Sequence, residues 1–213
     1  MGLKAPKGNN TSKVEQEKLE AGNYPARLVQ VIDMGLQPQR AYQGQDKPPA
    51  QEVMLTYEFV DEFLKDENGK DREDKPRWLS ETIPLRSLSS ELAKSTKRYN
   101  VFDPDGLYEG DFSKCINSPV MVALVRNGDY ENVGGVSVMR PKDAERCPEL
   151  VNPPKVFDLS NPDMEIFGSL PEWVREKIKG NLNYRGSKLH SLIEGVTADD
   201  NTPDDSDQDS PWD

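Results

Sequence analysis

Basic and aromatic side chains occur close together at three places in this sequence. Cations neutralise phosphate groups and flat rings stack on unpaired bases, which are the two requirements of a surface that binds single-stranded nucleic acid. Two or three stacking rings suffice for useful affinity, because each contributes about 1–3 kcal/mol. The residues that we predict to bind the strand are Arg40, Tyr42, Lys47, Arg77, Trp78, Arg126 and Tyr130.

Some aromatic and basic residues have a simpler interpretation. Tyr57 and Phe59 share one face of an alternating apolar pattern, so we expect both in the core. Trp78 fits a core position as well as a stacking position. The cations between residues 65 and 75 are mixed with acids, and a solvated hairpin tip explains them equally well. Tyr42 is the strongest stacking candidate, because it lies in a polar stretch with no obvious core role.

Residues 199–213 contain seven aspartates, no lysine or arginine, and one large aromatic residue. Such a run predicts a docking tail, which binds a basic-rimmed pocket on a partner or occupies the protein's own nucleic-acid groove. A disordered solubilising tail is the alternative. The predicted partner-binding residues are Asp204, Asp205, Asp207, Asp209 and Trp212.

Catalytic patterns are missing from the sequence. His190 is the only histidine, no phosphate-binding loop motif is present, and Cys115 and Cys147 lack the spacing of a zinc site. We expect no enzyme activity and no cofactor, and we interpret both cysteines as reduced thiols. A metal nuclease that uses Asp71 or Asp74 is a weaker alternative, because both aspartates fall in a predicted loop.

The charge balance depends strongly on the tail. The chain of 213 residues has a formal net charge of −11, but residues 1–198 carry 27 positive and 31 negative side chains, a net charge of −4. Global acidity therefore does not exclude an anionic partner. The sequence contains no run of 18 apolar residues and no apolar leader, so we expect neither a membrane span nor secretion.

The pattern of apolar residues predicts a mainly β fold. The order of elements is three strands, one helix and two strands, which is typical of a five-stranded OB-type barrel with its helix between the third and fourth strands. An open antiparallel sheet with one covering helix would give the same order. The predicted strands cover residues 26–32, 52–60, 78–85, 120–126 and 130–139, and the predicted helix covers 87–99. We expect a polar loop over residues 36–50, a hairpin turn at Asn68-Gly69 and a bulge at Gly134-Gly135.

These elements suggest four regions. Residues 1–19 form a disordered arm, 20–140 the OB-type domain, 141–194 a wrapping extension and 195–213 the disordered acidic tail. Within the extension, Ser169 and Glu172 resemble a capping box that starts a short helix over 169–180. We expect this helix to cover its own barrel, and packing against a second subunit in a homodimer is the alternative.

Two segments and the tail resemble the phage-encoded single-stranded DNA-binding proteins. They are residues 20–35 (EAGNYPARLVQVIDMG), residues 167–179 (FGSLPEWVREKIK) and the acidic run with Trp212. The tail is also similar to those of bacterial single-stranded DNA-binding proteins, which recruit replication proteins. The bacterial tails end in Pro-Phe, whereas here Asp213 follows Pro211-Trp212. Because host pockets that recognise the bacterial ending need not accept this one, we expect the partner to be encoded by the phage.

The resemblance implies sequence-independent binding of single-stranded DNA during phage replication, recombination and repair, in the host cytoplasm. The implied partners of the tail are a polymerase, a helicase or a recombinase. The competing hypothesis is an acidic adaptor or DNA mimic that binds a host DNA-handling protein. A DNA-binding protein needs its cations together in one groove, whereas a DNA mimic carries acidic residues across the corresponding surface.

Overall fold

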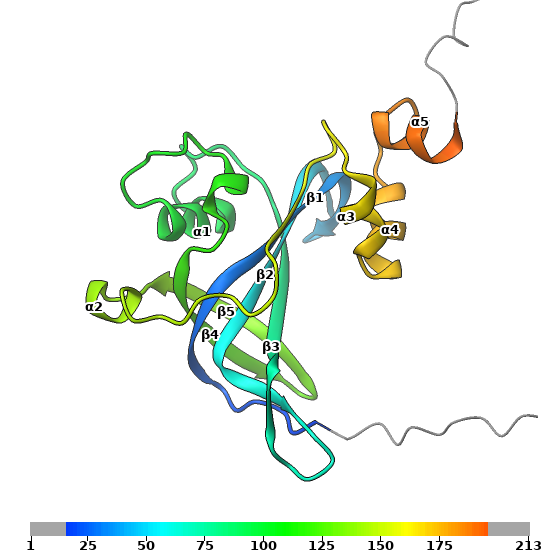
Figure 1. Cartoon of the computed structure of the whole chain (residues 1–213). Helices are drawn as coiled ribbons and strands as arrows, with labels where there is room; N and C mark the ends of the chain where they lie inside the picture. The colour runs from blue at the N-terminus through cyan, green and yellow to red at the C-terminus, as the bar shows by residue number, and fades with distance from the viewer. Residues whose placement is uncertain (1–15, 196–213) are drawn as a thin grey trace, which may run out of the picture. The chain divides into compact units, whose positions relative to one another are not determined.

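The computed structural model describes residues 16–195, and the fold is mainly β. Three long strands come first in this part of the chain, strands and short helices then alternate, and three short helices come last (Figure 1). The elements are β1 (Gly22–Tyr42), β2 (Gln45–Lys65), β3 (Asp71–Pro84), α1 (Lys94–Phe102), the 3-10 helix η1 (Phe112–Cys115), β4 (Pro119–Asn127), β5 (Tyr130–Val138), α2 (Pro141–Ala144), β6 (Lys155–Phe157), α3 (Met164–Ser169), α4 (Glu172–Lys179) and α5 (Lys188–Glu194).

The strands form a six-stranded sheet with the order β3-β2-β1-β4-β5, and β6 also pairs with β1. β1 and β4 are antiparallel, with Gly22 opposite Leu124, whereas β6 runs parallel to β1, with Val31 opposite Val156. The prediction of a mainly β fold with a helix between the third and fourth strands is confirmed. In the part of the chain that the structure describes, no pairing of β3 with β5 closes the sheet.

The described residues divide into two compact units. The first unit comprises residues 16–29, 56–81 and 117–154, and the second comprises 30–55, 82–116 and 155–195. β1 and β2 are each divided between the two units.

The core of the first unit lies on one face of β1, β2 and β4. Alternate residues of β4 are buried, as the period of two requires, whereas β1 and β2 bury consecutive residues in this unit because both of their faces are covered there. Tyr57 and Phe59 are 0% and 1% exposed, which confirms the prediction that both are core residues. Tyr24 packs on Phe59 with a ring-centroid distance of 5.4 Å.

The predicted bulge in the last strand is confirmed. Ala123 pairs with Gly135 but Leu124 pairs with Val133, so Gly134 is the extra residue of β5. An added Cβ at Gly134 would lie 2.6 Å from a methyl group of Val125, which explains the need for glycine at this position.

Residues 16–20 lie beside three strands of the first unit and have no regular secondary structure. Gln16 exchanges hydrogen bonds with the backbone of Lys65, Lys18 forms an ion pair with Asp129 at 2.6 Å, and the Leu19 N–H donates to Glu131. Leu19 is only 7% exposed. Residues 16–19, which the sequence assigns to a disordered arm, are thus tied to the ends of β2 and β5.

The predicted loop over residues 36–50 is wrong, because β1 and β2 continue through it as a hairpin. The turn is Gln43-Gly44, with φ values of 52° and 78°. Positive φ at both central residues matches the right-handed twist of the strands. Most side chains near this tip are exposed on both faces, so the apolar alternation that marks a strand is missing.

The second hairpin agrees with its prediction. Gly69 has φ of +76°, and the carboxylate of Asp66 accepts hydrogen bonds from the backbone N–H groups of Asn68 and Lys70. The flanking strands are longer than the sequence predicts, because β2 ends at Lys65 and β3 begins at Asp71.

The core of the second unit forms where β1, β2, β6 and the C-terminal helices meet. It contains Ile32, Met34, Met54, Phe157, Phe167, Leu170, Val174, Ile178 and Leu189. The predicted helix over 169–180 corresponds to α4, whose Val174 and Ile178 are fully buried. The capping box is wrong, because Ser169 ends α3 and Pro171 occupies the N-cap position of α4.

The helix predicted over 87–99 begins seven residues later than expected, at Lys94. Ser87 bonds Ser89 through its side chain, and such local serine bonds compete with helix formation. Leu92 lies before the start of the helix and is 87% exposed. Tyr99 is buried, and its hydroxyl donates to Asp103 and accepts from the Gly110 N–H.

Candidate nucleic-acid interface

Trp78 lies on the face of β3 opposite the core of the first unit. Its neighbour Leu79 is buried, so strand alternation directs Trp78 outward, where it is 40% exposed. Thr56 and Ser80 are hydrogen-bonded to each other on the same face of β2 and β3. Trp78 is therefore not a core residue, and part of its indole faces solvent.

A buried carboxylate fixes the indole. Trp78 donates its Nε1–H to Glu58 at 2.9 Å, and Glu58 itself is only 2% exposed. The same carboxylate accepts hydrogen bonds from the N–H groups of Val151 and Asn152. The sequence does not predict this role of Glu58, because an acidic residue that alternates with apolar residues in a strand is expected to face solvent.

Arg77 is engaged within the protein. Its guanidinium bonds both carboxylate oxygens of Glu131 on β5, the shorter distance being 3.1 Å, and it donates to the backbone carbonyl of Glu17. Only 16% of the Arg77 side chain is exposed. The prediction that Arg77 contacts a phosphate would require it to leave these partners.

Arg126 and Tyr130 lie at the turn between β4 and β5. Tyr130 pairs with Asn127 at the end of the ladder and is 77% exposed. Arg126 lies opposite Glu131 and is also exposed. The first unit therefore carries two exposed aromatic side chains from the predicted set, Trp78 and Tyr130.

Arg40, Tyr42 and Lys47 belong to the second unit, at the tip of the hairpin formed by β1 and β2. All three are exposed, and Tyr42 is 60% exposed. The ammonium of Lys47 lies 4.6 Å from the centroid of the Tyr42 ring, a cation–π contact that covers one ring face. The structure thus brings Tyr42 and Lys47 together as a cation–aromatic pair.

The hairpin between β2 and β3 has a pocket of about 550 Å³ near its tip. Three cations line the pocket, together with acidic and polar residues. Lys65 is held by Glu17, and Arg72 by Asp74 at 3.0 Å, so neighbouring acids already pair two of these cations. The arrangement agrees with a solvated hairpin tip as well as with a phosphate site.

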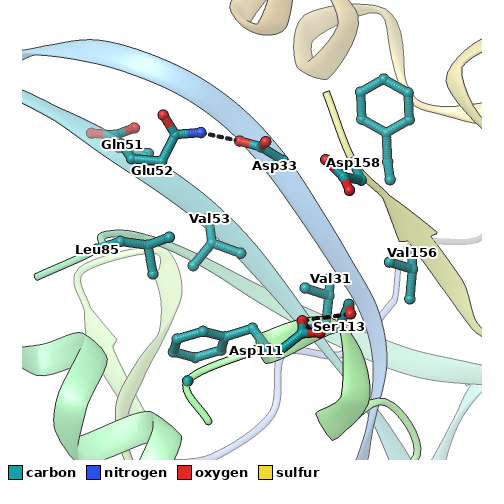
Figure 2. Close-up of a pocket in the computed structure, with 13 residues that line it drawn as sticks. Val31, Asp33, Gln51, Glu52, Val53, Leu85, Asp111, Ser113, Val156 and Asp158 are labelled. Atoms are coloured by element: carbon teal, nitrogen blue, oxygen red, sulfur yellow. Dashed lines mark hydrogen bonds between the residues drawn. The ribbon is translucent and has the colours of Figure 1, made fainter. Parts of the chain in front are cut away.

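A second pocket, of about 320 Å³, lies in the second unit and is acidic. Figure 2 shows the hydrogen bond from Gln51 to Asp33 and the bond between Ser113 and Asp111 at its wall. Glu52 and Asp158 also line it. Burial raises the pKa of Asp33, despite the hydrogen bonds donated by Gly35, Leu159 and Gln51. The carboxylates make this pocket unsuited to a nucleic-acid strand.

Residues 16–195 offer neither a cluster of metal-binding side chains nor an exposed thiol. No group of three or more His, Cys, Asp or Glu side chains there could hold a metal ion. Asp71 is exposed, and Asp74 pairs with Arg72. Cys115 and Cys147 are buried free thiols, and burial raises the pKa of Cys115 to about 12.

Among residues 16–195, none of the helices has the length and the apolar composition that a membrane-spanning helix requires.

The predicted tail residues, Asp204, Asp205, Asp207, Asp209 and Trp212, lie outside the described residues. Comparisons of the chain with protein-family models, with curated proteins and with solved structures find no match.

Proposed function

We propose that the protein binds single-stranded DNA without sequence preference. One observation carries this proposal. The three aromatic residues assigned to base stacking, Tyr42, Trp78 and Tyr130, are 60%, 40% and 77% exposed, whereas the strand aromatics Tyr57 and Phe59 are buried. Exposed rings beside cations serve single-stranded nucleic acid, because bases stack on the rings and phosphates meet the cations.

We also propose that the five long strands form an OB-type barrel. The strand order and the helix between β3 and β4 are those of this fold. The ion pair between Arg77 on β3 and Glu131 on β5 supports the closure, because it joins the two edge strands through side chains. On such a barrel Trp78 occupies the face of the second and third strands, where OB folds bind their ligands.

In this proposal the protein acts in phage replication, recombination and repair, in the host cytoplasm. The acidic tail recruits a replication protein and competes with DNA for the cationic groove. Its seven aspartates and Trp212 supply the negative charge and the apolar anchor that both roles need.

The test is fluorescence anisotropy of labelled oligo-dT and of a matching duplex, from low salt to about 0.3 M. Tight binding to the single strand alone is expected. Three exposed cations, Arg40, Lys47 and Arg126, predict a slope of about −2 or steeper for log affinity against log salt. Failure of both the intact and the tailless protein to bind would refute the proposal.

The acidic adaptor or DNA mimic is the second candidate, and the carboxylate-lined pocket of the second unit favours it. A basic host protein would then contact the two exposed carboxylates, Asp111 and Asp158, because Glu52 already pairs with Lys177 at 2.7 Å. Pull-down of a host DNA-handling protein, released by Asp111→Asn with Asp158→Asn, combined with no binding of oligo-dT, would establish this alternative.

A further inference from the structure

We infer that Glu58 is a positioning residue, which sets the orientation of the Trp78 indole for base stacking. The inference rests on the proposed function and identifies a residue outside the predicted interface. Glu58 lies on β2 beside Trp78, and its side chain is nearly inaccessible to solvent at 2% exposure. A buried carboxylate is costly unless hydrogen bonds compensate for its lost hydration.

Four hydrogen bonds from neutral donors provide that compensation. Oε1 accepts from the Val151 N–H at 2.7 Å. Oε2 accepts from Trp78 Nε1 at 2.9 Å, from Asn152 Nδ2 at 2.7 Å and from the Asn152 N–H at 3.3 Å. The indole N–H and the two Asn152 donors thus share Oε2, while Val151 holds Oε1, so the indole and residues 151–152 are fixed by the same carboxylate.

The other side of this arrangement is equally fixed. Arg27 on β1 alternates with the core residues Ala26 and Leu28, and it is 7% exposed. It donates to the carbonyl groups of Cys147 and Pro148 at 2.8 and 2.7 Å. Two buried charged side chains, Arg27 and Glu58, therefore hold residues 147–152 along this face.

A fixed ring loses less entropy when a base stacks on it, so preorganisation increases affinity. An exposed tryptophan without a partner for its N–H would sample several rotamers. Because Trp78 bonds a rigidly held acceptor, its exposed surface stays available in one orientation. Glu58 therefore affects DNA affinity through Trp78 without touching the strand.

The first measurement needs no variant. In the full-length protein, the indole N–H of Trp78 should exchange with solvent much more slowly than that of Trp173, which is 59% exposed. Proton–nitrogen NMR resolves the signals of the three indoles, and Trp78→Phe and Trp173→Phe identify the two that are compared. Equal exchange rates for Trp78 and Trp173 would show that the hydrogen bond to Glu58 is absent, and the inference would be overturned.

The second measurement is a double-mutant cycle on oligo-dT affinity. Glu58→Gln should weaken binding about tenfold, because the amide cannot accept every donor that the carboxylate accepts. In a Trp78→Phe background, which keeps a ring but has no N–H, the same change should have little effect. An equal loss in both backgrounds would mean that Glu58 acts on the fold alone, which refutes positioning.

The two proposals fail in different ways. If the unmodified protein does not bind oligo-dT, the proposed function is wrong, while the exchange rate of the Trp78 N–H still tests whether Glu58 fixes the ring. If binding is tight but the cycle is additive, only the positioning role is lost.

Discussion

Trp78 and Trp173 are both exposed, but their surroundings differ. Trp78 is fixed to a buried carboxylate on a sheet face, whereas Trp173 projects from α4, whose Val174 and Ile178 pack into the core of the second unit. Exposure makes both rings accessible to a base, and Trp78 differs from Trp173 in that a hydrogen bond to a buried carboxylate fixes its ring.

Trp78→Ala is expected to weaken oligo-dT binding by about 5- to 150-fold, because one stacked base contributes about 1–3 kcal/mol. Trp173→Ala is the matched control and should leave the affinity unchanged. Fluorescence anisotropy at constant salt measures both variants. If Trp78→Ala and Trp173→Ala weakened the affinity for oligo-dT equally, the assignment of Trp78 to base stacking would be wrong.

The buried hydroxyl of Tyr99 contributes to stability in a way that depends on pH. Burial, together with the carboxylate of Asp103, raises the pKa of Tyr99 to about 12 from its ordinary value of 10. The folded protein thus holds the phenolic proton more tightly than the unfolded chain. The stability contributed by this proton is fully present below pH 10 and is lost as the pH rises from 10 towards 12.

Tyr99→Phe should lower the free energy of unfolding by about 1–3 kcal/mol at pH 8, because Asp103 loses a donor and the Gly110 N–H loses its acceptor. The difference between the two proteins should shrink above pH 10. Urea unfolding at pH 8 and pH 11 measures both values. A difference that grows with pH would contradict this assignment.

The bulge in β5 gives a test at the level of elements. Gly134 faces the Val125 side chain, and an added methyl group would overlap it at 2.6 Å, whereas at Gly135 the nearest atom would lie 3.7 Å away. Gly134→Ala should therefore destabilise the protein by about 1–3 kcal/mol. Gly135→Ala is the matched control and should change stability by about 0.5 kcal/mol or less. Similar thermal shifts for the two variants would argue that the bulge tolerates a side chain.

The sequence predicts elements best where large apolar residues recur at every second position of a strand. Tyr57 and Phe59 follow the period of two, and the glycine pair in β5 marks its bulge, so both features could be predicted. The β1–β2 hairpin tip is exposed on both faces and gives no alternating signal. β6 has only three residues, too few to give a pattern in the sequence, and it is defined by its parallel pairing with β1 around Val31.

The candidate interface was predictable only in part. Tyr42 and Tyr130 are exposed as expected, because polar neighbours in the sequence indicate a surface position, whereas the sequence left Trp78 open between the core and the surface. Arg77 and Glu58 could not be assigned, since each role depends on a partner far along the chain. Arg77 bonds Glu131, 54 positions away, and Glu58 bonds Val151, 93 positions away. Local patterns do not fix such contacts.

Charge distribution is a property of the whole molecule. The net charge is −11, and residues 199–213 supply seven of the negative side chains. A polyanion that binds cationic surfaces must compete with this segment for the same cations. The tail therefore sets the effective affinity for DNA in the proposed function.

A protein lacking residues 199–213 should bind oligo-dT more tightly than the full-length chain, most clearly at low salt, where the competing attraction is least screened. It should also fail to recruit the replication partner. Replacing the tail aspartates with asparagine, while keeping Trp212, is the control that separates charge from length. Weaker or unchanged binding after truncation would show that the tail does not compete for the groove.

The position of residues 16–20 has a consequence for synthesis of the chain. Lys18 and Leu19 leave the ribosome early, but their partners Asp129 and Glu131 follow 111 and 112 positions later. At about 5–20 residues per second, this delay is about 6–22 s. Throughout that time the nascent strands lack the segment that later ties their ends, and their unpaired edges can meet those of neighbouring chains on the same messenger. Translation speed should therefore influence how much of the protein folds without aggregating.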